Sequence, residues 1–288
     1  MPTPDWRDIV ARVGDLPPMP HVAGRAIALV EEPETTASEL GRLLASDTAL
    51  ASRVLKIANS AMFSRQRKIT TINQAVMTIG FKALKGIIIA ASLRQLNKNF
   101  GALEKLLWEN AMGTAMAATR LAQQLKRRYV EEIFVSGLLH GLGQIVLTTS
   151  RETAADYGRV MGVIETEGVD FIAAETAVFG FAHPLVGALV AKKWNFSAET
   201  CHVILHYRDP VAASDERSET EEQAAIVQLA EMMSHLTGIG CPTGYPCQWE
   251  SARALARTLQ LVRDNDAVLS AIVAETKAQF ENDRHLYA

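Results

Sequence analysis

His140 is the residue of this sequence whose type and surroundings most suggest chemistry. It stands in the segment 136–147, between leucines, and Gly141 and Gly143 follow it. These apolar neighbours predict a buried helical segment whose imidazole faces the interior. Such an imidazole can be a metal ligand at the centre of a helical bundle, or a core histidine that hydrogen-bonds to a neighbour. Gly141 favours the second alternative, because a metal centre would use a carboxylate there.

The cysteines are the second group of side chains that could do chemistry. There are three of them, Cys201, Cys241 and Cys247, and so few thiols suit a reducing compartment such as the cytosol. Cys241 and Cys247 follow His235 and could form a metal clip with it, but their spacing matches no common zinc pattern. We therefore expect a loop with free thiols in this part of the chain.

Two short basic clusters could hold a phosphate group. One begins just after Phe63 and the other occupies residues 126–128, before Tyr129. A solvated helix end is the simpler explanation for both. The serines lack the context of a nucleophile elbow, and no glycine-rich strand-to-helix phosphate loop is present. These patterns therefore indicate no hydrolase or nucleotide-binding chemistry.

The composition of the chain is that of an ordinary globular protein. Its 288 residues are 48% hydrophobic and 21% charged, with a net charge of −3. This charge disfavours a nucleic-acid partner. The first residues are partly acidic and lack the apolar core of a signal peptide. The longest apolar run, 86–93, is far shorter than the roughly 20 residues of a membrane helix. We therefore expect a cytoplasmic protein without membrane contact.

Hydrophobic spacing and capping residues predict an all-α protein. The expected helices of the first hundred residues are short and lie at 22–32, 36–44, 47–58, 71–79 and 81–97. Those after them are mostly longer and lie at 103–124, 130–140, 152–166, 170–179, 183–194, 197–207, 223–236, 251–261 and 267–280. Residues 214–222 are expected to be a solvated connection, and 237–247 a loop rich in glycine and proline.

Several separated motifs, in this order, resemble the HDOD domain. They lie at 16–20, 46–63, 69–80, 107–110, 137–143, 183–187 and 193–194. Thr48 replaces the proline that usually follows the aspartate, which is a minor departure. The resemblance covers about 16–210 and implies a small N-terminal helical bundle at about 12–101, packed on a degenerate HD-domain-like bundle at 102–210. Residues 211–288 would be a helical extension that completes the second bundle.

The HDOD family is a non-catalytic relative of the HD and HD-GYP phosphohydrolases, whose histidines and aspartates hold divalent ions. The resemblance carries that ligand set onto six positions, namely Asn110, His140, Gly141, His183, His206 and Glu231. Asn110 and Gly141 stand where a histidine and the aspartate of the His-Asp pair are expected. The ligand set is therefore incomplete, although His140, His183 and His206 could still hold a lone metal ion.

The resemblance implies a bacterial signalling or regulatory module that acts by binding and needs no cofactor. A response regulator, a kinase or a cyclic-dinucleotide enzyme is the expected partner, with a nucleotide as an alternative ligand near the three histidines. A partner surface could include residues around the second helical motif, namely Asp47, Asn59, Ser60, Phe63, Arg65 and Arg67. The alternative function is a divalent-metal-dependent phosphohydrolase with a depleted ligand set.

Overall fold

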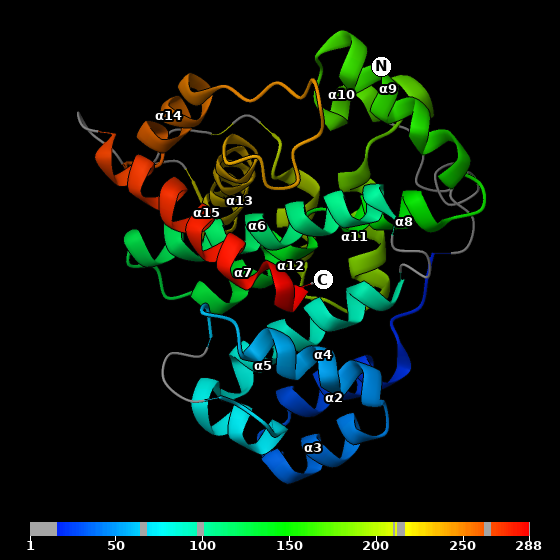
Figure 1. Cartoon of the computed structure of the whole chain (residues 1–288), viewed down its shortest axis with the longest axis vertical. Helices are drawn as coiled ribbons and strands as arrows, with labels where there is room; N and C mark the ends of the chain where they lie inside the picture. The colour runs from blue at the N-terminus through cyan, green and yellow to red at the C-terminus, as the bar shows by residue number, and fades with distance from the viewer. Residues whose placement is uncertain are drawn as a thin grey trace. The chain divides into compact units, whose positions relative to one another are not determined.

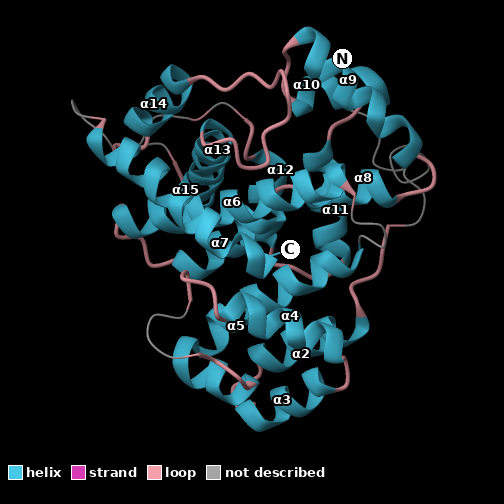
Figure 2. Ribbon diagram, in the orientation of Figure 1, coloured by secondary structure: helices cyan, strands magenta, loops and turns pink. Residues whose placement is uncertain are grey.

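The computed structural model describes residues 16–63, 68–96, 101–209, 211, 217–261 and 266–287. Every regular element of these residues is a helix, and Figure 2 shows no strand among them. This confirms the all-α prediction. The chain forms two compact units. We call the described residues of 19–98 and 277–288 the small unit, and those of 1–18 and 99–276 the large unit.

The small unit consists of short helices whose ends are set by local capping. Its elements, blue to cyan in Figure 1, are α2 (His21–Glu31), α3 (Ala37–Ala45), α4 (Thr48–Ala58) and α5 (Ile72–Leu96). The side chain of Thr36 accepts a hydrogen bond from the backbone of Glu39, as the predicted capping box requires. Asp47 caps α4 in the predicted way. Gly80, with φ of 79°, breaks α5 into the two predicted helices.

The large unit contains the longer helices and the candidate site. Its elements are α6 (Ala102–Gln124), α7 (Val130–Leu139), α8 (Leu142–Thr149), the 3-10 turn η1 (Ala154–Asp156), α9 (Tyr157–Glu167), α10 (Phe171–Phe179), α11 (His183–Lys193), α12 (Ala198–His206), α13 (Glu219–Leu236), α14 (Trp249–Thr258) and the start of α15 (Ala267–Tyr287). Asp170 caps α10, Pro184 stands at the first turn of α11, and Ser197 caps α12, all as predicted.

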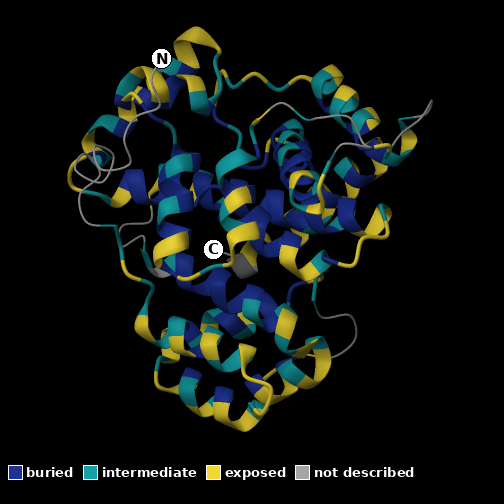
Figure 3. Cartoon of the chain, turned by 180° about the vertical axis from the view of Figure 1, so that it is seen from behind, coloured by how far each residue is buried: buried dark blue, intermediate teal, exposed yellow. Residues whose placement is uncertain are grey.

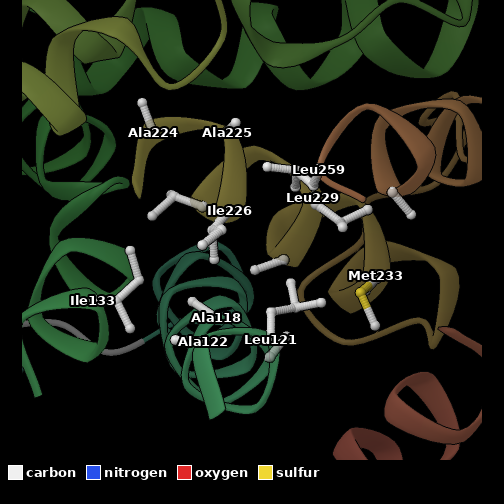
Figure 4. Packing of buried hydrophobic residues seen from close by; sticks show 14 of the residues in the cluster. Ala118, Leu121, Ala122, Ile133, Ala224, Ala225, Ile226, Leu229, Met233 and Leu259 are labelled. Atoms are coloured by element: carbon white, nitrogen blue, oxygen red, sulfur yellow. The ribbon is translucent and has the colours of Figure 1, made fainter. Parts of the chain in front are cut away.

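The core of the large unit depends on small side chains that let helices approach closely. Figure 4 shows Ala118, Leu121 and Ala122 of α6 packed with residues of α13, among them Ile226 and Leu229. All five of these side chains are fully buried. Figure 3 shows helices of this unit that are dark blue over most of their length. The alanine-rich composition therefore serves dense packing around α6 and α13.

Several helix boundaries differ from the prediction, among them the end of α15, which reaches Tyr287 rather than 280. The segment expected at 130–140 is followed by a separate helix, α8, and the chain turns between the two at His140 and Gly141. Helix α9 begins at Tyr157 rather than at 152. Helix α13 begins at Glu219, inside the expected solvated connection, because Ser218 forms a capping box with Glu221.

By length and composition alone, two stretches of the described residues could cross a membrane, Ile72–Arg94 and Val130–Thr149. The bent pair of α10 and α11 would be a third if it formed one span. From the sequence we considered only uninterrupted apolar runs, so the prediction did not include these membrane-length stretches. In the first stretch Gly80 breaks the helix, and 83% of an 18-residue window of the second stretch is buried inside the protein.

Candidate functional site

Glycines bring the helices of the large unit close enough for buried polar side chains to meet. A Cβ atom on Gly137 of α7 would lie 2.9 Å from the Cα atom of Ala115 in α6. A Cβ atom on Gly143 of α8 would lie 2.0 Å from the carbonyl oxygen of His183 in α11, and one on Gly187 would lie 3.1 Å from the Gly143 nitrogen. Only glycine fits at Gly137 and Gly143, and Gly187 leaves little room for a side chain, so these glycines allow the close helix contacts that place His140 and His183.

His183 has hydrogen bonds at both ring nitrogens. Its Nδ1 lies 2.7 Å from Oε2 of Glu175, and its Nε2 lies 2.7 Å from the hydroxyl of Tyr207. The backbone N–H of His183 also donates to Glu175, and the Tyr157 hydroxyl donates to the other carboxylate oxygen, each at 2.7 Å. All four side chains are fully buried. Burial raises the pKa of both tyrosine hydroxyls well above its ordinary value, so they stay protonated and can donate.

His140 is fully buried on the other side of Tyr207, whose ring it meets edge-on at 5.3 Å between centroids. Its Nδ1–H donates to the carbonyl of Gly137 at 2.6 Å. Its Nε2 has only distant neighbours, the Asn110 amide nitrogen at 3.4 Å and Oε1 of Glu231 at 3.6 Å. These contacts are longer than good hydrogen bonds, so this half of the cluster is more loosely joined than the half around His183.

Glu231 and Arg208 form the charged part of the cluster. Nε of Arg208 lies 3.4 Å from Oε2 of Glu231, whose side chain is 1% exposed. Burial by itself would raise the pKa of the Glu231 carboxyl, but the Arg208 guanidinium and the His140 ring hold it well below its ordinary value. Arg208 also donates to the Tyr245 hydroxyl at 2.6 Å and lies 3.5 Å from Asp170.

A cavity of about 190 Å³ borders this charged part, with Arg208, His235, Tyr245 and Cys247 in its lining. The His235 ring meets the Tyr245 ring at 4.5 Å between centroids and is almost fully buried. Burial lowers the pKa of His235 to about 4, with Glu231 opposing the shift. His235 is therefore neutral at pH 7, and Arg208 is the cation that faces this cavity.

The structure separates His206 from the other two histidines. Its side chain is 38% exposed, and its Nδ1 lies 2.7 Å from Asp209 on the surface. Successive residues of an α-helix point about 100° apart, so the end of α12 directs Tyr207 into the cluster and His206 away from it. The expectation that His206 shares a pocket with His140 and His183 is corrected by this geometry.

The metal centre of the catalytic HD relatives does not fit the residues of this cluster. Both ring nitrogens of His183 are engaged, by Glu175 and Tyr207. The carboxylate of Glu231 already faces the guanidinium of Arg208, which opposes a divalent cation. Within the described ranges, no group of three or more His, Cys, Asp or Glu side chains is arranged to hold a metal ion. The donors around His183 suit a hydrogen-bonded core, and those around Glu231 suit a buried charge pair.

The residues expected on a partner surface have mixed positions in the small unit. Asn59 bonds the backbone oxygens of Leu55 and Ile69 and the nitrogen of Ile69, each at 2.7 Å, so its side chain holds the turn after α4. Ser60 is fully buried, whereas Phe63 is half-buried. The remaining members of this set are Asp47, which caps α4, and Arg65 and Arg67, which lie outside the described residues.

Several residues of the cluster were missed from the sequence, and the central ones are Glu175, Tyr207 and Arg208. Glu175 had a signal, because it is the one charged residue of the apolar helix α10. A lone carboxylate on such a helix predicts a buried polar partner. Tyr207 and Arg208 directly follow His206. Which of these three side chains faces the cluster depends on how the end of α12 packs against the other helices.

Comparisons with known proteins agree with this architecture. A Treponema pallidum (strain Nichols) protein of uncharacterised function is 24% identical over 209 residues, which are 72% of this chain and 40% of that protein. The chain thus spans less than half the length of this relative. An HDOD domain protein of unknown function from Geobacter sulfurreducens is 26% identical, with a TM-score of 0.76 and coverage of 98% of this chain and 95% of that one.

Two further solved structures share the fold at lower identity. A candidate phosphohydrolase from Shewanella amazonensis SB2B is 21% identical, with a TM-score of 0.72 and coverage of 97% of this chain and 98% of that one. A candidate signal transduction protein from Marinobacter aquaeolei VT8 is 19% identical, with a TM-score of 0.69 and coverage of 99% and 62%. The model of the HDOD domain matches residues 16–210. This chain belongs to the HDOD domain family.

Proposed function

We propose that this protein is a signalling module that acts by binding a partner and not by turnover. The observation that carries the proposal is that two positions matched to the HD metal ligands, His183 and Glu231, already have other partners. His183 is held by Glu175 and Tyr207, and Glu231 is paired with Arg208. A metal phosphohydrolase needs an open metal position that polarises the substrate or activates water. This cluster fits the role of a rigid core better than the role of a catalytic metal centre.

A protein partner suits the structure better than a small ligand at the cluster. The cavity beside Arg208 and His235 has a volume of about 190 Å³. Pockets for small molecules commonly measure roughly 300–1,000 Å³, so a nucleotide would exceed this cavity. The solved relative named as a candidate signal transduction protein supports a signalling role. The proposed partner classes are a response regulator, a kinase and a cyclic-dinucleotide enzyme.

The proposed location is the bacterial cytoplasm, where such partners act. The second membrane-length stretch, Val130–Thr149, carries His140 and is mostly buried within the large unit. A core position explains its apolar composition as well as a bilayer would. With a net charge of −3, nucleic acid is a poor partner, and a salt-dependent gel shift would test that exclusion.

The test combines a binding assay with a turnover assay on the full chain. Purified candidate partners of the three classes are titrated by calorimetry, and we expect a saturable complex with one of them. A chromogenic phosphodiester with added Mn²⁺ is expected to show no turnover above the buffer rate. Turnover that disappears in His140→Ala would establish the phosphohydrolase instead. Absence of both binding and turnover would remove the support for the binding module.

A further inference from the structure

The loop at residues 237–247 carries two thiols that the proposed function leaves unused. The Sγ atoms of Cys241 and Cys247 lie 3.1 Å apart, and both residues are half-buried. A disulfide needs an S–S separation of about 2.0 Å, so a shift of about 1 Å would join them. Disulfides that form in a reducing compartment are usually transient and serve catalysis or redox sensing.

The backbone of this loop holds the two cysteines together. Pro242 and Pro246 lie between them and restrict the chain. The N–H of Tyr245 donates to the Pro242 carbonyl at 3.2 Å, and the N–H of Cys247 donates to the Tyr245 carbonyl at 2.9 Å. Gly244 has φ of 78°, and its Cβ would lie 2.8 Å from Glu165 of α9. The folded loop therefore already holds the two thiols close together, so forming a disulfide costs little further chain entropy.

The same loop covers the charged part of the candidate site. Between the two cysteines, Tyr245 accepts a hydrogen bond from Arg208 and packs against His235. Cys247 lines the cavity of about 190 Å³ beside them. At the start of the loop, a Cβ on Gly240 would lie 2.3 Å from the backbone nitrogen of Asn110. A bond between the cysteines would therefore fix the segment that carries Tyr245.

We propose that Cys241 and Cys247 form a reversible disulfide that fastens this loop over Arg208 and makes the protein responsive to thiol redox state. The oxidant class is a low-molecular-weight disulfide such as oxidised glutathione. The Cys247 thiolate attacks one sulfur of that disulfide and releases one glutathione thiolate, which takes up a proton. The Cys241 thiol then loses its proton and attacks Sγ of Cys247, which expels the second glutathione. Two protein thiols are oxidised and one glutathione disulfide is reduced.

The environment of the two thiols supports this order of attack. A hydrogen bond from Cys241 lowers the pKa of the Cys247 thiol, whereas the same pairing together with burial raises the pKa of Cys241. Cys247 also lines the cavity beside Arg208, whereas the Cys241 thiol faces the Pro242 carbonyl at 3.7 Å, so we assign Cys247 as the nucleophile and Cys241 as the resolving thiol. Cys201, on α12, is the matched control, because it is also half-buried and burial raises its pKa.

The first test counts thiols in the full chain, equilibrated without oxygen in glutathione buffers and then alkylated. Wild type should show three alkylated cysteines when reduced and one, Cys201, when oxidised, with recovery in dithiothreitol. The Cys201→Ser variant should show two alkylated cysteines when reduced and none when oxidised. Cys241→Ser should trap glutathione on Cys247. A bridge that involves Cys201, or wild type that carries only glutathione adducts, would overturn the proposal.

The second test measures whether the bond fastens the loop. Amide hydrogen exchange in residues 238–247 should be ~tenfold slower in the oxidised than in the reduced protein. Cys247→Ser should show the same exchange in both buffers. A disulfide that leaves the exchange of this loop unchanged would refute its role in fastening the loop. Neither test uses a partner or turnover, so its outcome is independent of the proposed function.

Discussion

The two halves of the buried cluster differ in how well their polar groups are satisfied. Around His183, the bonds to Glu175 and Tyr207 are 2.7 Å long, and every member is fully buried. Around Glu231, the contacts to His140 and Arg208 are 3.6 and 3.4 Å long, and the cavity lies alongside. The first half has the geometry of a fixed structural network. The second half depends on charge balance, so pH and charge substitutions should affect it most.

Removal of the cation should have the largest effect on the second half. Arg208→Met leaves the buried Glu231 carboxylate without its compensating charge, and we expect a loss of about 3–5 kcal/mol in the free energy of unfolding. Urea unfolding measures the loss. The double variant Arg208→Met with Glu231→Leu should regain much of it, because it leaves no buried charge unpaired. A double variant no more stable than the single one would contradict this account.

Acid should weaken the second half before the first. The pKa of His235 is lowered from 6.5 to about 4, so the unfolded chain takes up a proton at higher pH than the folded one. The free energy of unfolding should therefore fall by about 3 kcal/mol as pH drops from 6.5 to 4. Glu231, whose pKa is also lowered, should add to the loss at lower pH. The measurement is urea unfolding at several pH values.

The matched control for the pH experiment is His235→Gln. This variant should lose most of the pH dependence between pH 4 and 6.5, because no imidazole then titrates at that position. An unchanged slope in the variant would mean that another group causes the acid sensitivity.

Tyr207→Phe should sharpen the description of the first half. The substitution keeps the ring that packs on His140 but leaves Nε2 of His183 without its hydroxyl partner. We expect a loss of about 2 kcal/mol in the free energy of unfolding, since an unsatisfied buried polar group costs roughly 1–3 kcal/mol. A loss below about 0.5 kcal/mol would mean that the His183 network is not a rigid element.

His206→Ala should have the smallest effect. The side chain is 38% exposed and contacts surface Asp209 and the His202 ring, and exposed pairs contribute roughly 0–1 kcal/mol. We expect a change within about 0.5 kcal/mol in urea unfolding. A loss as large as that of Tyr207→Phe would place His206 in the cluster after all.

The sequence predicted most of the fold because helix ends depend on local chemistry. Asp47, Asp170 and Ser197 cap helices as expected, since a capping side chain acts on a backbone N–H two or three residues away. Resemblance to a family identified four members of the cluster, Asn110, His140, His183 and Glu231. Gly141, the other matched position that the structure places here, directly follows His140 and is the N-cap residue of α8.

The rest of the site depends on packing that local patterns do not record. Glu175 meets His183 only because the chain bends by 86° between α10 and α11. Tyr207, and not His206, reaches the cluster because of the helical phase at the end of α12. The start of α13 at Glu219 was missed because a run of acidic residues has the composition of both a solvated connection and a first helical turn.

The most direct test of the central claim is a calorimetric titration of Mn²⁺ into the chelator-treated full chain at pH 7. Since both ring nitrogens of His183 are hydrogen-bonded and Glu231 faces Arg208, we predict no saturable binding, and heats that match those of His140→Ala. One-to-one binding in the wild type that is lost in His140→Ala would contradict the claim that the cluster is a hydrogen-bonded core.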